Sequence, residues 1–138
     1  MQLLTTNGVG RGMELGDKLV ARTEACTEGG AVYAAASTLE RVYASNCSPA
    51  SPFLTGALTM ADVAVFCYLG HATCGFFDGI PPSFIKAFTH LTAVRKAVVG
   101  LPVVKKYYES TAGEEYMKLS MGGIEVGGMY AAMIDSAK

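Results

Sequence analysis

Apolar residues recur at intervals of three and four through most of the chain, which places them on one face of a helix. Val32, Ala36, Leu39 and Tyr43 form one such stripe. No useful run of alternating apolar and polar residues appears, and no segment of roughly 20–50 residues repeats. The pattern therefore predicts an all-α fold, with helices over residues 13–27, 31–45, 59–73, 83–99 and 101–111.

The helix over residues 59–73 has the clearest start signal. Thr59 occupies the N-cap position, where its hydroxyl can accept the backbone N–H of Asp62 while the Asp62 carboxylate accepts the N–H of Thr59. Leu58 and Val63 flank this capping box at the positions of a hydrophobic staple. The residues that follow are apolar almost all round, which predicts a buried central helix.

The pattern divides the chain into three parts. Residues 1–12 are predicted to be irregular, residues 13–111 to form the helical domain, and residues 112–138 to form an apolar arm rich in Gly and Met. Paired glycines disfavour regular structure in the arm, yet it is too apolar for ordinary disorder. We expect contact with another chain to order it, the alternative being that it packs over its own helices. The candidate interface residues are Met117, Met121, Ile124, Val126, Met129 and Tyr130.

Composition narrows the function classes. The formal charge is −1, and no run of Lys and Arg is longer than two, so a nucleic-acid partner is not expected. Hydrophobic residues make up 51% of the chain and charged residues only 17%, against about 25% in ordinary domains. The chain therefore either buries much of its surface against protein partners or is one half of something larger.

Location is predicted from what the sequence lacks. The longest nearly apolar stretch has about 15 residues, where about 20 are needed to span a membrane, so no transmembrane span is expected. The sequence is compatible with contact to a membrane-associated complex. It is also compatible with a presequence or a further domain upstream of Met1. The first twelve residues do not have the pattern of a secretory signal. The four cysteines follow no disulfide framework, which favours an intracellular, reducing compartment.

Few residues are candidates for chemistry. Cys67, His71 and Cys74 share one helix face, but three ligands on one straight helix rarely converge on a metal ion. We interpret the two cysteines as small core residues and His71 as hydrogen-bonded at the helix end. His90 has the same two cysteines as candidate partners for a thiol–imidazole pair, and nothing in the sequence brings them together. Glu40 is interpreted as part of a solvated helix face. We expect no catalytic, cofactor-binding or metal site.

The order of these segments resembles a known family. Residues 53–64, FLTGALTMADVA, are similar to the "fl-x-G-x-x-LT-x-AD" signature of the glutathione S-transferase C-terminal domain, with a loop one residue shorter. Residues 88–107 resemble the closing helices of that domain, which end in a "v-x-x-lP-x-v-x-x-Y" pattern. Residues 37–43 lie where the family places a leucine-rich helix, so the resemblance covers roughly residues 31–109. It implies the helical bundle of that domain.

The departures from the family bear on function. In the family an N-terminal thioredoxin-like domain holds glutathione and supplies the catalytic residue, and this chain contains no such pattern. The residues carried over are Thr59 and Asp62, in a structural role. We therefore expect a non-catalytic module that binds other protein subunits, as an accessory or structural subunit of a larger assembly. The alternatives are the hydrophobic co-substrate half of a glutathione transferase, with glutathione as its cofactor, and a carrier of small hydrophobic ligands.

Overall fold

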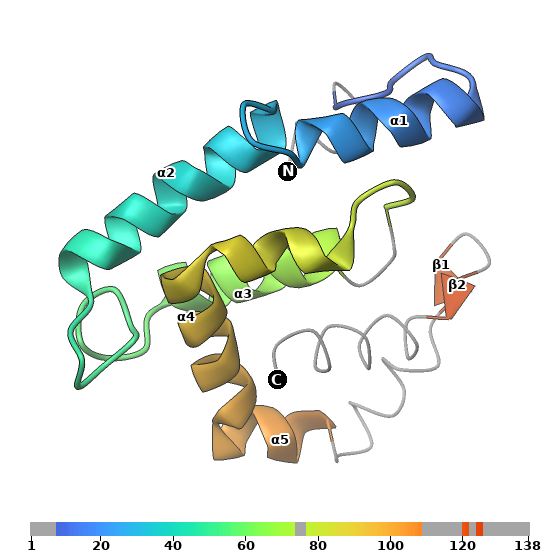
Figure 1. Ribbon diagram of the computed structural model, residues 1–138. Helices are drawn as coiled ribbons and strands as arrows, with labels where there is room; N and C mark the ends of the chain where they lie inside the picture. The colour runs from blue at the N-terminus through green and yellow to red at the C-terminus, as the bar shows by residue number, and fades with distance from the viewer. Residues whose placement is uncertain (1–7, 74–76, 109–119, 122–123, 126–138) are drawn as a thin grey trace.

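The computed structural model describes residues 8–73, 77–108, 120–121 and 124–125. Its described residues are mainly helical, so the predicted all-α class is confirmed (Figure 1). Two strands of two residues each pair as an antiparallel hairpin late in the chain. The elements are α1 (Leu15–Ala25), α2 (Ala31–Asn46), α3 (Met60–Thr73), the 3₁₀ helix η1 (Pro82–Ala87), α4 (Thr89–Gly100), α5 (Pro102–Tyr108), β1 (Ser120–Met121) and β2 (Ile124–Glu125).

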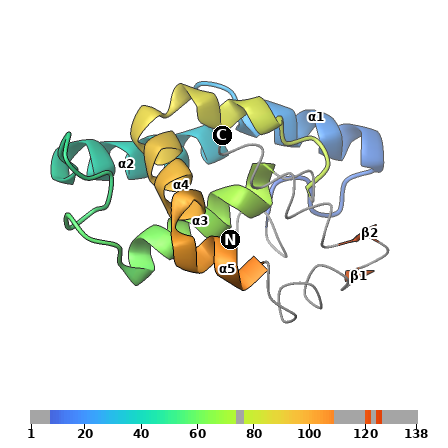
Figure 2. The same ribbon diagram turned by 90° about the horizontal axis from the view of Figure 1, so that it is seen from below.

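Helix α4 lies at the centre of the bundle. It packs most extensively against α3 and α2, and it also contacts η1 and α5. Helices α1 and α2 follow each other along one side of the molecule, while α5 turns away at the opposite side (Figures 1 and 2). Helices α1 and α5 therefore lie at opposite ends of the bundle.

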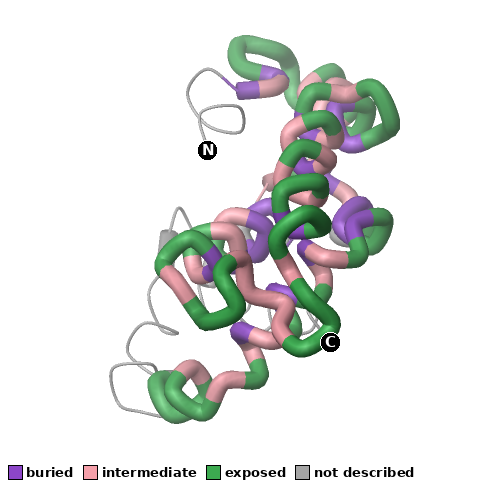
Figure 3. The backbone as a smooth tube through the Cα atoms, turned by 90° about the vertical axis from the view of Figure 1, so that its left-hand side faces the viewer, coloured by how far each residue is buried: buried purple, intermediate pink, exposed green. Residues whose placement is uncertain are grey.

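The core forms where these helices face one another, and the outward sides are exposed (Figure 3). The predicted stripe on α2 is confirmed in that Val32, Ala36 and Tyr43 are buried, with Leu39 half-buried at its edge. The other large core side chains come from α3, η1 and α4 and the turn between them: Phe66, Leu69, Ile80, Phe84, Ile85, Phe88, Leu91, Val94 and Val98.

The single helix predicted over residues 83–99 is wrong, because the structure contains two helices there. Phe88 is in an extended conformation, with φ −114° and ψ 95°, and it separates η1 from α4. Its buried ring packs 5.0 Å from the ring of Tyr33 and 6.2 Å from that of Phe84. The break gives α4 its own N-terminus, which receives a cap from another part of the chain, as described below.

The predicted burial of α3 on every side is also wrong. Phe66, Leu69 and Ala72 face the core, but Cys67 is exposed and Met60 keeps 79% of its surface accessible. The apolar pattern of a helix reports how hydrophobic its faces are, and it carries no information on whether a neighbour covers each one. The neighbours that pack extensively on α3 are α4 and η1, which leaves part of its surface open.

The predicted arm contains the short hairpin. Met121 pairs with Ile124 across β1 and β2, so two of the candidate interface residues lie opposite each other. The other four, Met117, Val126, Met129 and Tyr130, lie outside the described residues. The domain boundaries at residues 12 and 111 stay predictions. Within the described part of the chain, no helix is long and apolar enough to cross a bilayer.

Candidate functional site

A buried carboxylate fixes the start of α3. Asp62 is fully buried, and its Oδ2 accepts the backbone N–H of Thr59 at 2.8 Å, the contact that the capping-box pattern predicts. The Thr59 hydroxyl donates to the same oxygen at 2.7 Å. Oδ1 accepts the backbone N–H of Leu54 at 3.0 Å and the hydroxyl of Tyr43 at 3.0 Å. Asp62 therefore joins the N-terminus of α3 to the preceding loop and to α2.

Electrostatics match this geometry. Burial alone would raise the pKa of Asp62, but the hydrogen bonds from Thr59, Leu54 and Tyr43 stabilise the carboxylate and lower that pKa overall. Burial and the neighbouring carboxylate raise the pKa of the Tyr43 phenol, which keeps it a proton donor. The network is held in one protonation state at neutral pH.

A second carboxylate fixes the start of α4. Glu40, on α2, accepts the backbone N–H groups of His90 and Leu91, each at 2.9 Å, and lies 2.8 Å from the Nδ1 atom of His90. Its side chain is only 20% exposed, so the interpretation of Glu40 as a solvated surface residue is wrong. Burial acts to raise its pKa, and the hydrogen bonds from His90 and Leu91 outweigh that effect and lower it.

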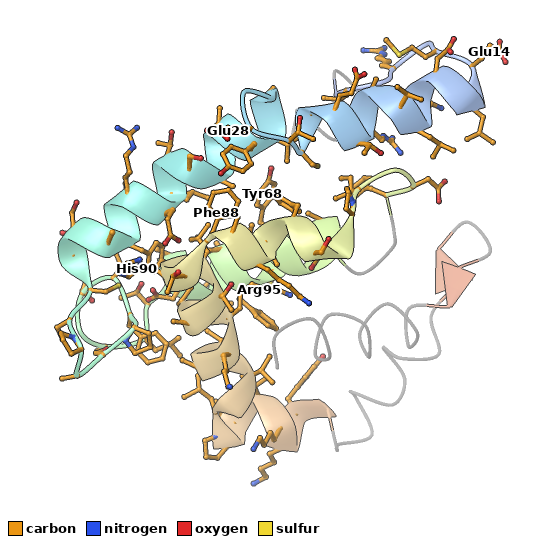
Figure 4. The ribbon with its side chains drawn as sticks, in the orientation of Figure 1. Glu14, Glu28, Tyr68, Phe88, His90 and Arg95 are labelled. Carbon is orange, nitrogen blue, oxygen red and sulfur yellow. The ribbon has the colours of Figure 1, made fainter. Side chains whose placement is uncertain are left out.

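His90 lies beside Glu40 of α2 (Figure 4). Of its two candidate partners, Cys67 lines a different hollow and Cys74 lies outside the described residues. His90 shares a cavity of about 350 Å³ with Cys47, Ser48, Pro49, Pro52 and Ala93. The Cys47 thiol donates to the carbonyl of Pro52 at 3.1 Å, and burial, followed by the charges of Asp62 and Glu40, raises its pKa. A protonated thiol is a poor nucleophile, so this cavity has no activated cysteine.

A largely apolar hollow lies where α3, the end of α4 and α5 meet. Its volume is about 300 Å³, and its walls include Leu58, Val63, Phe66, Cys67, Val104 and Tyr107. Two residues predicted for the hydrophobic staple, Leu58 and Val63, thus line one depression. We call this depression the α3–α5 groove.

The rim of the α3–α5 groove is exposed to an unusual degree for such apolar residues. Val103 keeps 66% of its surface accessible, Tyr107 47% and Leu58 40%. Met60, at the start of α3, keeps 79%. Isolated exposed apolar residues are common on proteins, but a group of them around one hollow is typical of a binding surface.

The candidate metal ligands are not assembled in the described part of the chain. Cys67 lines the α3–α5 groove, Cys74 lies outside the described residues, and the side chain of His71 is not described. Among the described residues, no group of three His, Cys, Asp or Glu side chains is arranged to hold a metal ion.

Comparison with known families shows which family this helical bundle belongs to. Residues 22–111, more than half of the chain, match the family described as "Glutathione S-transferase, C-terminal domain". The chain belongs to this family. Searches of curated proteins and of solved structures found no match. The resemblance carried by residues 31–109 is thus confirmed, and the capping network of Asp62 occupies the signature segment of this glutathione S-transferase C-terminal domain.

Two elements of the site were missed at the level of the sequence. The bond from Tyr43 to Asp62 joins residues 19 positions apart, and the bond from Glu40 to His90 joins residues 50 positions apart. The stripe on α2 carries one signal for the first, because a tyrosine on a buried face needs a partner for its hydroxyl. Nothing local in the sequence marks Glu40.

Proposed function

We propose that this glutathione S-transferase C-terminal domain is a non-catalytic module that binds another protein, as an accessory or structural subunit of a larger assembly. The observation that carries the proposal is the exposed apolar rim of the α3–α5 groove. Val103 and Tyr107 stand on one side of the hollow, and Leu58 stands on the other. Together they form a group of exposed apolar side chains around one hollow, which is typical of a binding surface.

Burial of this rim would stabilise a complex. Transfer of apolar surface from water is worth roughly 25 cal/mol per Å², so covering a half-exposed Val, Leu or Tyr contributes about 1 kcal/mol each. Met60, which is 79% exposed at the start of α3 and is not part of the groove lining, offers an adaptable side chain on the same helix, since methionine fits irregular partner surfaces. These contributions supply only part of what a complex needs, because lost translational and rotational freedom costs roughly 4–15 kcal/mol, so the partner must also cover surface beyond the rim.

The state of the thiols supports the non-catalytic part of the proposal. Burial raises the pKa values of Cys26 and Cys47. A cysteine that acts as a nucleophile instead has a lowered pKa, usually through a nearby cation or a helix N-terminus. Cys26 and Cys47 form no disulfide, which supports the proposal of a reducing intracellular compartment.

The alternative is that the groove binds a small hydrophobic molecule, as the co-substrate half of a transferase or as a carrier. The groove volume of about 300 Å³ favours small-molecule binding, because ligand pockets have volumes from roughly 300 Å³ upwards. In the transferase case glutathione would require a thioredoxin-like partner domain. Saturable binding of an apolar dye by the isolated chain, lost in Val103→Asp, would favour this alternative over a protein partner.

Site-specific photo-crosslinking tests the proposal. A benzophenone amino acid replaces Val103 in the groove, and in a control chain it replaces Thr38, which is exposed on α2. We expect discrete protein adducts from the groove position and none from the control. Equal or absent adducts at both positions would contradict a protein interface here. The same experiment on a chain lacking residues 112–138 shows whether the predicted arm is needed for that contact.

A further inference from the structure

Charge is distributed unevenly over the bundle. Between Gly79 and Tyr108 the chain has no acidic residue, and it has five basic ones. Arg95 is buried, and the exposed members are Lys86, Lys96, Lys105 and Lys106. Lys105 and Lys106 lie on α5, between the groove residues Val104 and Tyr107. The lining of the α3–α5 groove is thus apolar, and the two lysines lie on the flanks of α5 outside that lining.

Helix α1 carries the opposite combination. Met13, Asp17, Val20, Ala21 and Glu24 border one shallow, open depression on its outer side. Met13 precedes α1, and the other four residues, spaced by three, one and three positions, share one face of the helix. Met13 is 48% exposed and Val20 58%, while the two carboxylates are also on the surface. This outer face of α1 is apolar and acidic.

The basic side chains of α1 are held away from that face. Arg22 donates to the carbonyl oxygens of Val9 at 3.3 Å and Asp78 at 3.0 Å, and its guanidinium lies 5.9 Å from the centre of the Phe77 ring. Lys18 packs closely on the Gly10 backbone, where a Cβ added to the glycine would lie 2.6 Å from its Cγ. The cations of α1 therefore do not neutralise Asp17 and Glu24 on the outer face.

The two surfaces lie on opposite ends of one molecule. Helix α1 is at the top right of Figure 1 and α5 is at the bottom, with α3 and α4 between them. A single folded chain cannot bring them together. Two chains can, because the surfaces are complementary in charge and both expose apolar side chains.

We propose that the α3–α5 groove of one copy binds the outer face of α1 of a second copy. Val20 and Met13 would enter the apolar hollow, and Asp17 and Glu24 would meet Lys105 and Lys106. This is the helix-in-groove mode of recognition. The proposal rests on the proposed function, since it names the partner of the same groove as another copy of this chain.

The contact is head-to-tail, because the groove and α1 are different surfaces. After the first contact forms, one copy keeps its groove free and the other keeps the outer face of its α1 free, so the pair has one free surface of each kind. Such an arrangement grows into a closed ring or an open filament, depending on the rotation between neighbours. It would make the chain the repeating unit of a structural assembly. Association should weaken with added salt because the charged pairs lie at the border of the interface.

Paired charge reversals test this arrangement. The groove variant carries Lys105→Glu and Lys106→Glu, and the helix variant carries Asp17→Lys and Glu24→Lys. Sedimentation velocity is measured at about 50 mM salt, at protein concentrations up to about 0.1 mM. Arg41→Glu, an exposed substitution on α2, is the matched control, and circular dichroism checks that every variant keeps its helices.

We expect wild type and the Arg41 variant to associate beyond the 14.5 kDa monomer, with at least a tenfold weaker association for each reversal variant alone. An equimolar mixture of the two variants should associate again, because the unchanged acidic α1 of the groove variant can meet the unchanged basic groove of the helix variant, and the two reversed surfaces are complementary as well. A monomeric wild type, or a mixture that stays monomeric, would overturn the head-to-tail contact. If Val103 crosslinks to a different protein while wild type is monomeric, the proposed function survives and this inference fails. If Val103 gives no adduct at all, both fail.

Discussion

Glu40 and His90 lie 50 residues apart in the sequence, yet the imidazole Nδ1 of His90 is 2.8 Å from the Glu40 carboxylate. The same carboxylate accepts the backbone N–H groups of His90 and Leu91. A side chain from α2 therefore acts as the N-cap of α4, where an anion also interacts favourably with the helix dipole. This contact holds the two helices in register.

Replacement of Glu40 should destabilise the fold more than replacement of a partly exposed residue usually does. Glu40→Gln removes the charge that accepts two backbone N–H groups, and we expect a loss of about 2 kcal/mol in the free energy of unfolding. Glu28→Gln, an exposed change before α2, should cost less than about 0.5 kcal/mol. Urea unfolding followed by circular dichroism measures both, and equal midpoints would refute the cap.

The network of Asp62 predicts a graded series. Thr59→Ala should cost about 1 kcal/mol, because it removes one donor to the carboxylate. Asp62→Ala should cost about 3 kcal/mol, since it leaves the buried Tyr43 hydroxyl and two backbone N–H groups without their acceptor. Thr38→Ala is the matched control, because that hydroxyl contacts only the Ala34 carbonyl of its own exposed helix turn. Equal thermal unfolding midpoints for all three variants would contradict the assignment.

Acid should unfold the domain through both carboxylates. The pKa values of Asp62 and Glu40 are lowered in the folded state, so the unfolded chain binds more protons as the pH falls below about 5. Their contribution to stability is fully present above that range and is lost towards the lowered pKa values. Unfolding free energies measured from about pH 6 to pH 3 should therefore fall, and the slope should be shallower in Asp62→Asn and Glu40→Gln. An unchanged slope in both variants would exclude these groups as the cause.

The sequence predicts what is local in this fold and misses what is distant. Thr59 and Asp62 are three positions apart, so their contact follows from helix geometry alone. The bond from Tyr43 to Asp62 and the cap that Glu40 gives α4 depend on how α2 lies against its neighbours, and no short-range pattern encodes that. The apolar run of α3 predicts burial, but the exposure of Cys67 depends on where α4 and α5 end.

The thiols should react slowly. Burial raises the pKa of Cys26, and burial with nearby carboxylates raises that of Cys47, so the reactive thiolate is scarce at neutral pH. Alkylation by iodoacetamide, followed by peptide mass spectrometry, should be at least about tenfold slower at both than in the urea-unfolded chain. A cysteine that reacts faster in the folded protein would contradict the absence of an activated nucleophile among the described thiols.

Glutathione should not bind the isolated chain. In the family its site lies in a thioredoxin-like domain. Glutathione carries two carboxylates, and neither the His90 cavity nor the α3–α5 groove has Lys or Arg in its lining. Titration calorimetry with millimolar glutathione should give only heats of dilution. Saturable heat that is unaffected by groove substitutions would place a glutathione site in the chain and contradict the non-catalytic proposal.

Solvent protection of the groove is the most direct test of an interface on the α3–α5 side. Hydroxyl-radical labelling with mass spectrometry compares the protein in its native assembly with the diluted, isolated chain. Met60 and Tyr107, which are 79% and 47% exposed, should be labelled several-fold less in the assembly, while Val42 on α2, at 42%, should be labelled equally in both. Equal labelling of Met60 and Tyr107 in the two states would contradict the account.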